Sequence, residues 1–215
     1  MIKKLDNLFS TPFWTFDLNK DNPQLSKMIE MDGVDFSKCV TDKKANSIVP
    51  ANVRYDFFKH GGYGGISDLY ENTINAISEV AKDQRWEDYT VEIRARQNVI
   101  LPGQCDTPHH HQGLDLIGIY YVTVPKLSGD ILLFETRGSV NRLWEDPMVT
   151  PDSMGRTGRV YYRHKPQVGT LIMFPSYLFH AVETNLSNEP RISIVMDIRI
   201  NHDYPDIYEY ISTND

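Results

Sequence analysis

The sequence predicts a mainly β protein with an N-terminal helical part, built as a sandwich or a double-sheet jelly roll. One amphipathic segment ends near Trp86, and no second long helical pattern follows it. After Trp86 come β-branched and aromatic runs separated by Gly, Pro, Asn and Asp, which is typical of strands and turns. Many short strands joined by turns favour these two β architectures. The 215 residues are expected to form one domain, since β folds of this size often fold as one unit.

A helix is predicted over residues 66–86. Leu69, Ile77 and Val80 recur at helical spacing along one face, and acidic residues concentrate at the start of the segment, as the helix dipole favours. Before the helix, the run LFSTPFWTFDL is expected to form a short strand, and the weakly periodic stretch Pro23–Glu30 could form a short helix. The glycine-rich segment FFKHGGYGGISD is interpreted as a loop.

Seven strands are expected in the rest of the chain. They cover residues 89–101, 116–123, 130–136, 158–163, 168–174, 178–184 and 191–200. Together they should form a jelly-roll core at about residues 89–200, with the N-terminal strand and the helix packed on it. The stretch 137–157 is long, irregular and rich in Pro, Gly and charge. Long loops in compact domains are often functional, so this loop is expected to border a substrate pocket.

Composition and charge narrow the classes of function. The formal net charge is -7 and no Lys/Arg run occurs, so contact with nucleic acid or an anionic membrane is not expected. No stretch approaches the roughly 20 apolar residues that span a bilayer. The two cysteines, Cys39 and Cys105, lie far apart and the N-terminus lacks an apolar run of signal-peptide length, which favours a reducing cytoplasm. The sequence leaves the oligomeric state open, and a homodimer is one option.

Three consecutive histidines in the segment PHHHQG supply the most informative chemistry. Side chains alternate along an extended segment, so His109 and His111 should share one face while His110 points away. Two imidazoles on one face can bind one metal ion, and His180, which follows the turn in MFPSYLFHA, is the best candidate for a third ligand. Imidazole suits Fe, Zn, Cu and Ni, so the ligands alone do not select the metal. The alternative is a solvated histidine turn together with a hydrogen-bonded core residue at His180.

The strand RISIVMDIRI opens with Arg191 and places Ser193 on the same face. An arginine among Ile and Val is costly to bury unless it meets an anion. A forked guanidinium beside a hydroxyl suits a carboxylate. An arginine facing water at the start of an edge strand is the other interpretation. Combined with the histidines, the pair favours an iron site with a dicarboxylate partner.

Four segments in this order resemble the 2-oxoglutarate/Fe(II)-dependent oxygenases: PHHHQGLDLIGIYYVTVP, DILLFETRG, VGTLIMFPSYLFHAVETN and PRISIVMDI. The likeness covers residues 89–200 and is to an uncharacterised H-x-H branch, with prolyl-hydroxylase-like features. It implies a double-stranded β-helix with iron at the mouth of the barrel. It also implies a hydroxylase that needs Fe(II), 2-oxoglutarate and O₂, and that forms succinate and CO₂ as it oxidises a C–H bond.

Carried over residue by residue, the resemblance makes His109 the first metal ligand and His180 the distal one. It also makes Arg191 and Ser193 the residues that bind the far carboxylate of 2-oxoglutarate. Tyr121, in the IYYV strand, is similar in position to a tyrosine that supports this carboxylate in prolyl-hydroxylase-like members.

The second metal ligand departs from the superfamily pattern, which has Asp or Glu two residues after the first histidine. This chain has His111 there. His111 would complete an all-histidine triad; alternatively Asp115 would swing in, or water or another anion would fill an open position. A third imidazole would leave the iron one charge unit more positive than a carboxylate would.

The substrate is not identifiable from the sequence, and either a small molecule or a peptide is compatible with it. Arg137, in FETRGS, would contact substrate or pair with an acid, and His164 is expected to be structural. The main alternative function is a three-histidine, cupin-like metal dioxygenase or a metal-binding protein that does not use 2-oxoglutarate, such as a zinc hydrolase. A binding module without turnover is a third class. Arg191 and Ser193 favour the 2-oxoglutarate-dependent oxygenase over both alternatives, since they have no evident purpose without a dicarboxylate.

Overall fold

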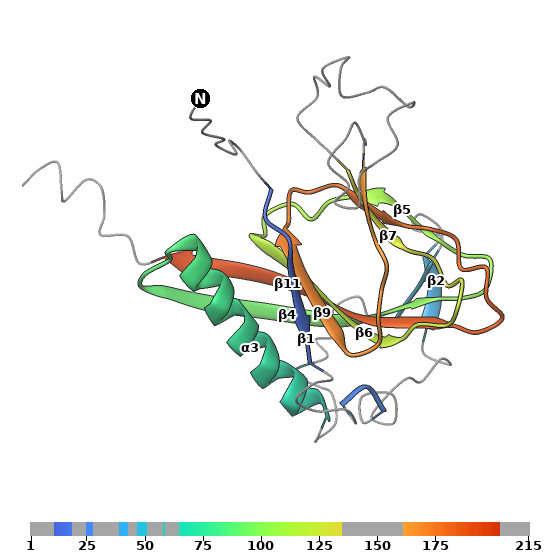
Figure 1. The fold of residues 1–215 in the computed structure, drawn as a ribbon, viewed down its shortest axis with the longest axis horizontal. Coiled ribbons are helices and arrows are strands. Elements are labelled where there is room, and N and C mark those ends of the chain that lie inside the picture. The colour runs from blue at the N-terminus through green and yellow to red at the C-terminus, as the bar shows by residue number, and fades with distance from the viewer. Residues whose placement is uncertain are drawn as a thin grey trace, which may run out of the picture.

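The computed structural model describes residues 11–18, 25–27, 39–42, 47–50, 58, 65–134 and 161–202 of the chain. The elements in chain order are β1 (Trp14–Asp17), β2 (Cys39–Asp42), β3 (Ser47–Pro50), α3 (Gly65–Gln84), β4 (Tyr89–Ile100), β5 (Asp106–His109), β6 (Leu116–Thr123), β7 (Ile131–Phe134), β8 (Tyr161–His164), β9 (Thr170–Pro175), β10 (His180–Val182) and β11 (Arg191–His202). Figure 1 shows a barrel-like body of strands with one long helix along its side.

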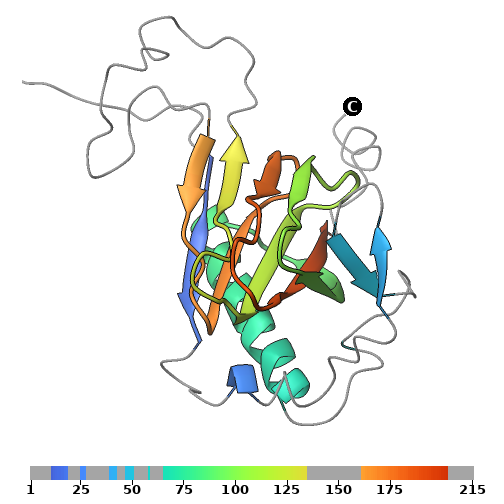
Figure 2. The ribbon, with the colours of Figure 1, turned by 90° about the vertical axis from the view of Figure 1, so that its right-hand side faces the viewer.

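The strands form two antiparallel sheets, which Figure 2 shows from the side. The larger sheet has the order β1-β9-β6-β11-β4-β3-β2, and the smaller has the order β5-β10-β7-β8. From β4 onward the chain passes repeatedly between them, because β4, β6, β9 and β11 belong to the larger sheet and β5, β7, β8 and β10 to the smaller. This alternation is that of a double-stranded β-helix, a form of jelly roll. The predicted fold class is therefore confirmed.

The helix α3 covers the outer face of the larger sheet (Figure 1). Its apolar stripe, which includes Leu69, Ile77 and Val80, is buried in one cluster with even-numbered residues of β11 such as Ile194 and Met196. An apolar stripe at helical spacing stabilises a helix mainly through such tertiary packing. The helix therefore packs against the outer face of β11 and buries it.

A second apolar cluster fills the space between the two sheets. It contains residues of the larger sheet such as Tyr121 and Val195 together with Ile131 and Leu133 of the smaller one. Since side chains alternate along a strand, the odd-numbered residues of β11 face this interior and the even-numbered ones face α3. The inward positions of β11 carry Arg191, Ser193, Val195 and Asp197.

Most predicted elements are confirmed. The predicted helix corresponds to α3, and each of the seven predicted strands overlaps an observed one, while the N-terminal run contains β1. Residues 25–27 are helical, and the rest of the stretch Pro23–Glu30 lies outside the described residues. The long stretch 137–157, including Arg137, also lies outside them.

The strands β2, β3 and β5 were not predicted. β5 has the sequence DTPH, which is polar and contains proline, so it reads as a turn. It is a strand because β10 supplies an antiparallel partner, with His180 opposite His109. Within the described part of the chain, no helix is long and apolar enough to cross a membrane.

Candidate metal centre

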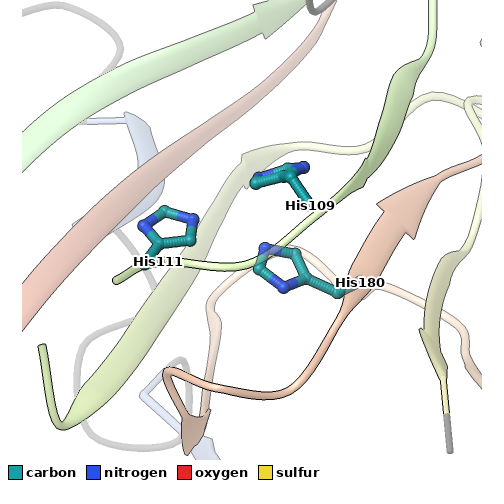
Figure 3. Close-up of side chains that lie close together, drawn as sticks. All are labelled: His109, His111 and His180. Carbon is teal, nitrogen blue, oxygen red and sulfur yellow. The ribbon is translucent and has the colours of Figure 1, made fainter. Parts of the chain in front are cut away.

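His109, His111 and His180 are brought together by the pairing of β5 with β10. His109 ends β5 and His180 begins β10, directly opposite each other, and His111 follows before the next turn. Each residue offers one ring nitrogen, and these atoms all lie within 4.8 Å of one another. Figure 3 shows the three rings gathered around one space. Among the described residues, no other group of His, Cys, Asp or Glu side chains meets this test.

The tautomers of His109 and His180 follow from their backbone contacts. Nδ1 of His109 lies 2.7 Å from the carbonyl oxygen of Thr107. Nδ1 of His180 lies 2.9 Å from the carbonyl oxygen of Leu178. A carbonyl oxygen only accepts, so each Nδ1 carries the proton and donates it. In a neutral ring the Nε2 atom is then a bare lone pair, which is the form that binds a metal.

His111 is oriented by a side chain instead. Its Nδ1 lies 2.8 Å from Oδ1 of Asp197, whose other oxygen lies 2.7 Å from Nη1 of Arg96. Burial alone would raise the pKa of the Asp197 carboxyl, but the hydrogen bond from His111 and the charge of Arg96 outweigh it and hold that pKa below its ordinary value. Asp197 is therefore an ionised acceptor, and Nε2 of His111 is left to face the other two histidines.

Burial keeps His180 in the form that a metal needs. Only 3% of the residue is exposed. Burial, reinforced by the neighbouring His109 ring and opposed by the hydrogen bond to Leu178, lowers the pKa of His180 to about 3. His180 is thus neutral near pH 7, and its lone pair is available to a cation.

Asp115 makes hydrogen bonds to the backbone of β11. Its Oδ2 atom accepts a hydrogen bond from the backbone N–H of Ile200 at 2.7 Å, and its own backbone N–H donates to Ile198 at 3.0 Å. These contacts join the start of β6 to β11. The geometry thus favours His111 over Asp115 as a third ligand. His110 packs its ring against Phe179, with 4.4 Å between the centroids, and does not belong to the histidine cluster.

A buried cation lies in the same barrel interior. Arg191 is 1% exposed, and its Nε and Nη2 atoms have no hydrogen-bond partner among the described residues. Its Cζ atom lies 5.3 Å from the centroid of the Tyr121 ring. Burial lowers the pKa of Arg191, while Tyr121 and the carboxylates of Asp106 and Asp130 act in the opposite direction. Unused donors on a buried guanidinium are costly, so the site fits an anion that would accept from them.

Tyr121 and Ser193 lie beside this cation. Burial raises the pKa of Tyr121 to about 12 although Arg191 acts against it, so the phenol is neutral. Its hydroxyl has no hydrogen-bond partner among the described side and main chains. Ser193 is 1% exposed, pairs with Tyr121 across β6 and β11, and lies two positions from Arg191 on the inner face. The structure thus brings together the three residues that the sequence singled out for carboxylate binding.

The three residue sets fit the groups that the sequence suggests. Three bare imidazole nitrogens suit Fe(II), and also Zn, Cu or Ni. A guanidinium, a phenol and a serine hydroxyl in a closed apolar space suit one end of a dicarboxylate. Both sets lie in the space between the two sheets.

Residues 95–197 match a protein family described as "Putative 2OG-Fe(II) oxygenase". Over this segment the chain is similar to 2-oxoglutarate/Fe(II) oxygenases. The matched segment contains the three histidines, Tyr121, Arg191 and Ser193. No curated protein sequence matches this chain significantly.

Solved structures share the fold of this chain at low sequence identity. A Pseudomonas putida prolyl-4-hydroxylase has a TM-score of 0.58 and 11% identity, covering 89% of this chain and 94% of its own. A Trichoplax adhaerens prolyl hydroxylase, in complex with a hypoxia inducible factor oxygen degradation domain peptide fragment, has a TM-score of 0.53 and 11% identity, covering 97% and 90%. The non-haem alpha-ketoglutarate-dependent epimerase SnoN of nogalamycin biosynthesis has a TM-score of 0.55 and 11% identity, covering 88% and 78%.

Sequence reasoning did not single out two charged residues in the barrel interior. Asp197 and Arg96 adjoin His111, and a charged residue at an inward position of a strand is the signal that could have found them. His164, which we expected to be structural, is half-buried with an Nε2 atom that has no partner among the described residues, and its ring lies 6.4 Å from that of Tyr121. Burial lowers the pKa of His164.

Proposed function

We propose that this chain hydroxylates a C–H bond of a substrate while it converts 2-oxoglutarate and O₂ to succinate and CO₂. One oxygen atom would enter succinate and the other the hydroxylated product, so the reaction balances without a further reductant. The observation that carries this proposal is the pair of complementary sites in one interior: three bare imidazole nitrogens and a buried guanidinium without hydrogen-bond partners for two of its nitrogens among the described residues.

In this proposal His109, His111 and His180 hold Fe(II). The bound iron, with 2-oxoglutarate, supplies the oxidising chemistry. The three Nδ1–H donors keep the rings fixed, so that each Nε2 points at a common position without a conformational search. Because all three ligands are neutral, the site would carry more positive charge than one with a carboxylate ligand.

The far carboxylate of 2-oxoglutarate is assigned to Arg191, Tyr121 and Ser193. The guanidinium would donate through its unused Nε and Nη2 atoms, and the phenol and the serine hydroxyl would add one donor each. The surrounding apolar cluster excludes water, which strengthens such charge-assisted hydrogen bonds. The chain's own part in turnover is to orient the two reactants and keep the site dry.

The substrate is proposed to be a small molecule or a peptidyl side chain. The Trichoplax adhaerens relative was solved with a peptide fragment, and SnoN is described as an epimerase in the biosynthesis of a natural product. A screen of proline-containing peptides against small metabolites, with substrate-dependent succinate release as the signal, would separate the two classes. We also propose a cytoplasmic location, on the basis of two cysteines in 215 residues, and cell fractionation tests it.

A three-histidine metalloprotein that does not use 2-oxoglutarate is the second candidate. The all-histidine ligand set favours it, since such a site also suits Zn and other divalent metals. The two candidates differ in what Arg191 does, because only the oxygenase needs a dicarboxylate beside it.

Anaerobic protein with Fe(II) and 2-oxoglutarate provides the test. We expect a weak visible charge-transfer band, together with slow succinate release once O₂ is admitted, even without substrate. Correctly metallated protein that shows neither signal would exclude the oxygenase and favour the second candidate.

A further inference from the structure

The three histidines differ in the group that accepts a hydrogen bond from Nδ1. His109 and His180 each donate from Nδ1 to a backbone carbonyl two residues earlier in the chain. His111 donates instead to Oδ1 of Asp197, 86 residues away in the sequence. Only this one of the three rings therefore has a formal negative charge as its hydrogen-bond partner.

Asp197 has a fixed position. It lies within β11, which pairs with β4 over its whole length and with β6 on its other side. Its second oxygen accepts from Arg96 of β4 at 2.7 Å. The side chains of His111, Asp197 and Arg96 are 10%, 24% and 28% exposed. The carboxylate is thus held between a cation and an imidazole, with both oxygens used.

We propose that Asp197, held by Arg96, is the positioning residue for His111 as a metal ligand and supplies, on the far side of the His111 ring from Nε2, the negative charge that three neutral imidazoles lack. The inference rests on the proposed function in one respect, that His111 binds the metal. A carboxylate that accepts from the distal ring nitrogen fixes the tautomer and increases the basicity of the coordinating nitrogen. Arg96 holds the second oxygen of this carboxylate.

The tautomer of His111 can be measured on the metal-free wild-type protein. We expect long-range ¹H–¹⁵N correlation spectra near pH 7.5 to show the Nδ1–H form, with Nε2 unprotonated. A dominant Nε2–H form would overturn the proposal. This experiment needs no variant and no turnover, so it tests the proposal even if the variants described below do not fold.

Titration with Co(II), followed by its visible absorption, tests the effect on the metal. Asp197→Asn keeps the shape and removes the charge, and we expect it to weaken Co(II) binding by about 10–100-fold. Asp115→Asn is the matched control, because Asp115 also accepts one hydrogen bond near β11 but contacts no histidine. Asp115→Asn should bind Co(II) as the wild type does, and equal affinity in Asp197→Asn would contradict the proposal.

The Fe(III)/Fe(II) potential, measured without 2-oxoglutarate, gives a readout that a merely structural residue would not move. Loss of a nearby negative charge destabilises Fe(III) more than Fe(II), so the potential should rise in Asp197→Asn and stay unchanged in Asp115→Asn. An unchanged potential in Asp197→Asn would also contradict the proposal. A wild type that binds metal and shows these effects but releases no succinate would contradict the proposed function alone.

Discussion

His180 lies directly opposite His109 in the antiparallel pair of β10 and β5, with 4.4 Å between the two ring centroids. Each ring also donates to the backbone carbonyl two residues earlier in the chain. Two ligands of the proposed iron site are therefore positioned by main-chain pairing, and the third by a side chain.

Replacement of His180 should weaken metal binding strongly. His180→Ala removes a ligand rather than its support, so we expect metal affinity to fall by more than about 100-fold, beyond the effect of an outer partner. Metal content after anaerobic loading and gel filtration measures this. His110→Ala is the control, since His110 lies outside the cluster, and a similar loss in that variant would contradict the assignment.

Replacement of Arg191 should separate cosubstrate binding from metal binding. Truncating one partner of a buried charge pair costs about 2–5 kcal/mol, so Arg191→Gln should weaken 2-oxoglutarate binding by roughly 30-fold to several thousand-fold. Metal content should not change. Calorimetric titration of the Fe(II) or Zn(II) protein with 2-oxoglutarate provides the measurement, and wild-type affinity would remove Arg191 from the proposed role.

Replacement of Arg191 should stabilise the ligand-free protein, although it weakens 2-oxoglutarate binding. A buried donor without a partner costs about 1–3 kcal/mol, and more when the group is charged, so replacing the guanidinium by an apolar side chain of similar length removes that cost. We therefore expect Arg191→Met to raise the free energy of unfolding of the ligand-free protein. In saturating 2-oxoglutarate the wild type should gain stability and the variant should not. Urea unfolding under both conditions gives the comparison.

The metal-free protein should lose stability as the pH falls below 6.5. The pKa of His180 is about 3 in the folded state against 6.5 for the ordinary side chain, so between these values only the unfolded chain binds the proton. The contribution of His180 is present above pH 6.5, and it falls by up to about 1.4 kcal/mol for each pH unit below it. Urea unfolding between pH 7 and pH 5 should show a shallower decline in His180→Gln. Identical slopes would show that burial does not lower the pKa of His180.

Gly129 in the turn between β6 and β7 should tolerate no side chain. Its φ is +91°, and a Cβ atom would lie 2.3 Å from the carbonyl oxygen of Glu183. Gly129→Ala should lower the free energy of unfolding by about 1–3 kcal/mol or more, through both backbone strain and steric overlap. Gly103→Ala provides a contrast, because its φ is also positive but no atom lies within 4 Å of the added Cβ. The Gly103 variant should be the more stable of the two.

Seven of the eight strands from β4 to β11 were predictable because they are β-branched and aromatic runs with clear turns. β5 could not be found in this way, since DTPH becomes a strand only through its pairing with β10. Local propensity is weak for such a segment, and tertiary context decides its structure.

The parts of the candidate site that lie within one extended segment were predictable, and the contacts between distant segments were not. Alternation placed His109 and His111 on one face and Arg191 beside Ser193, since these relations lie within one extended segment. The contact of Asp197 with His111 joins residues 86 apart and depends on how two sheets face each other. The nearness of His164 to Tyr121 likewise depends on tertiary structure, because it joins β8 to β6.

β11 carries Arg191 and Asp197 six residues apart on one face, and it is paired on both sides. An extended strand rises about 3.3 Å per residue, so the two Cα atoms are separated by about 20 Å of rigid backbone. Insertion or loss of one residue between them would turn one of the two side chains outward. Over evolutionary time this strand can therefore accept substitutions but no change of length. New substrate preferences in related proteins should instead arise in the connecting segments, where insertions leave that spacing intact.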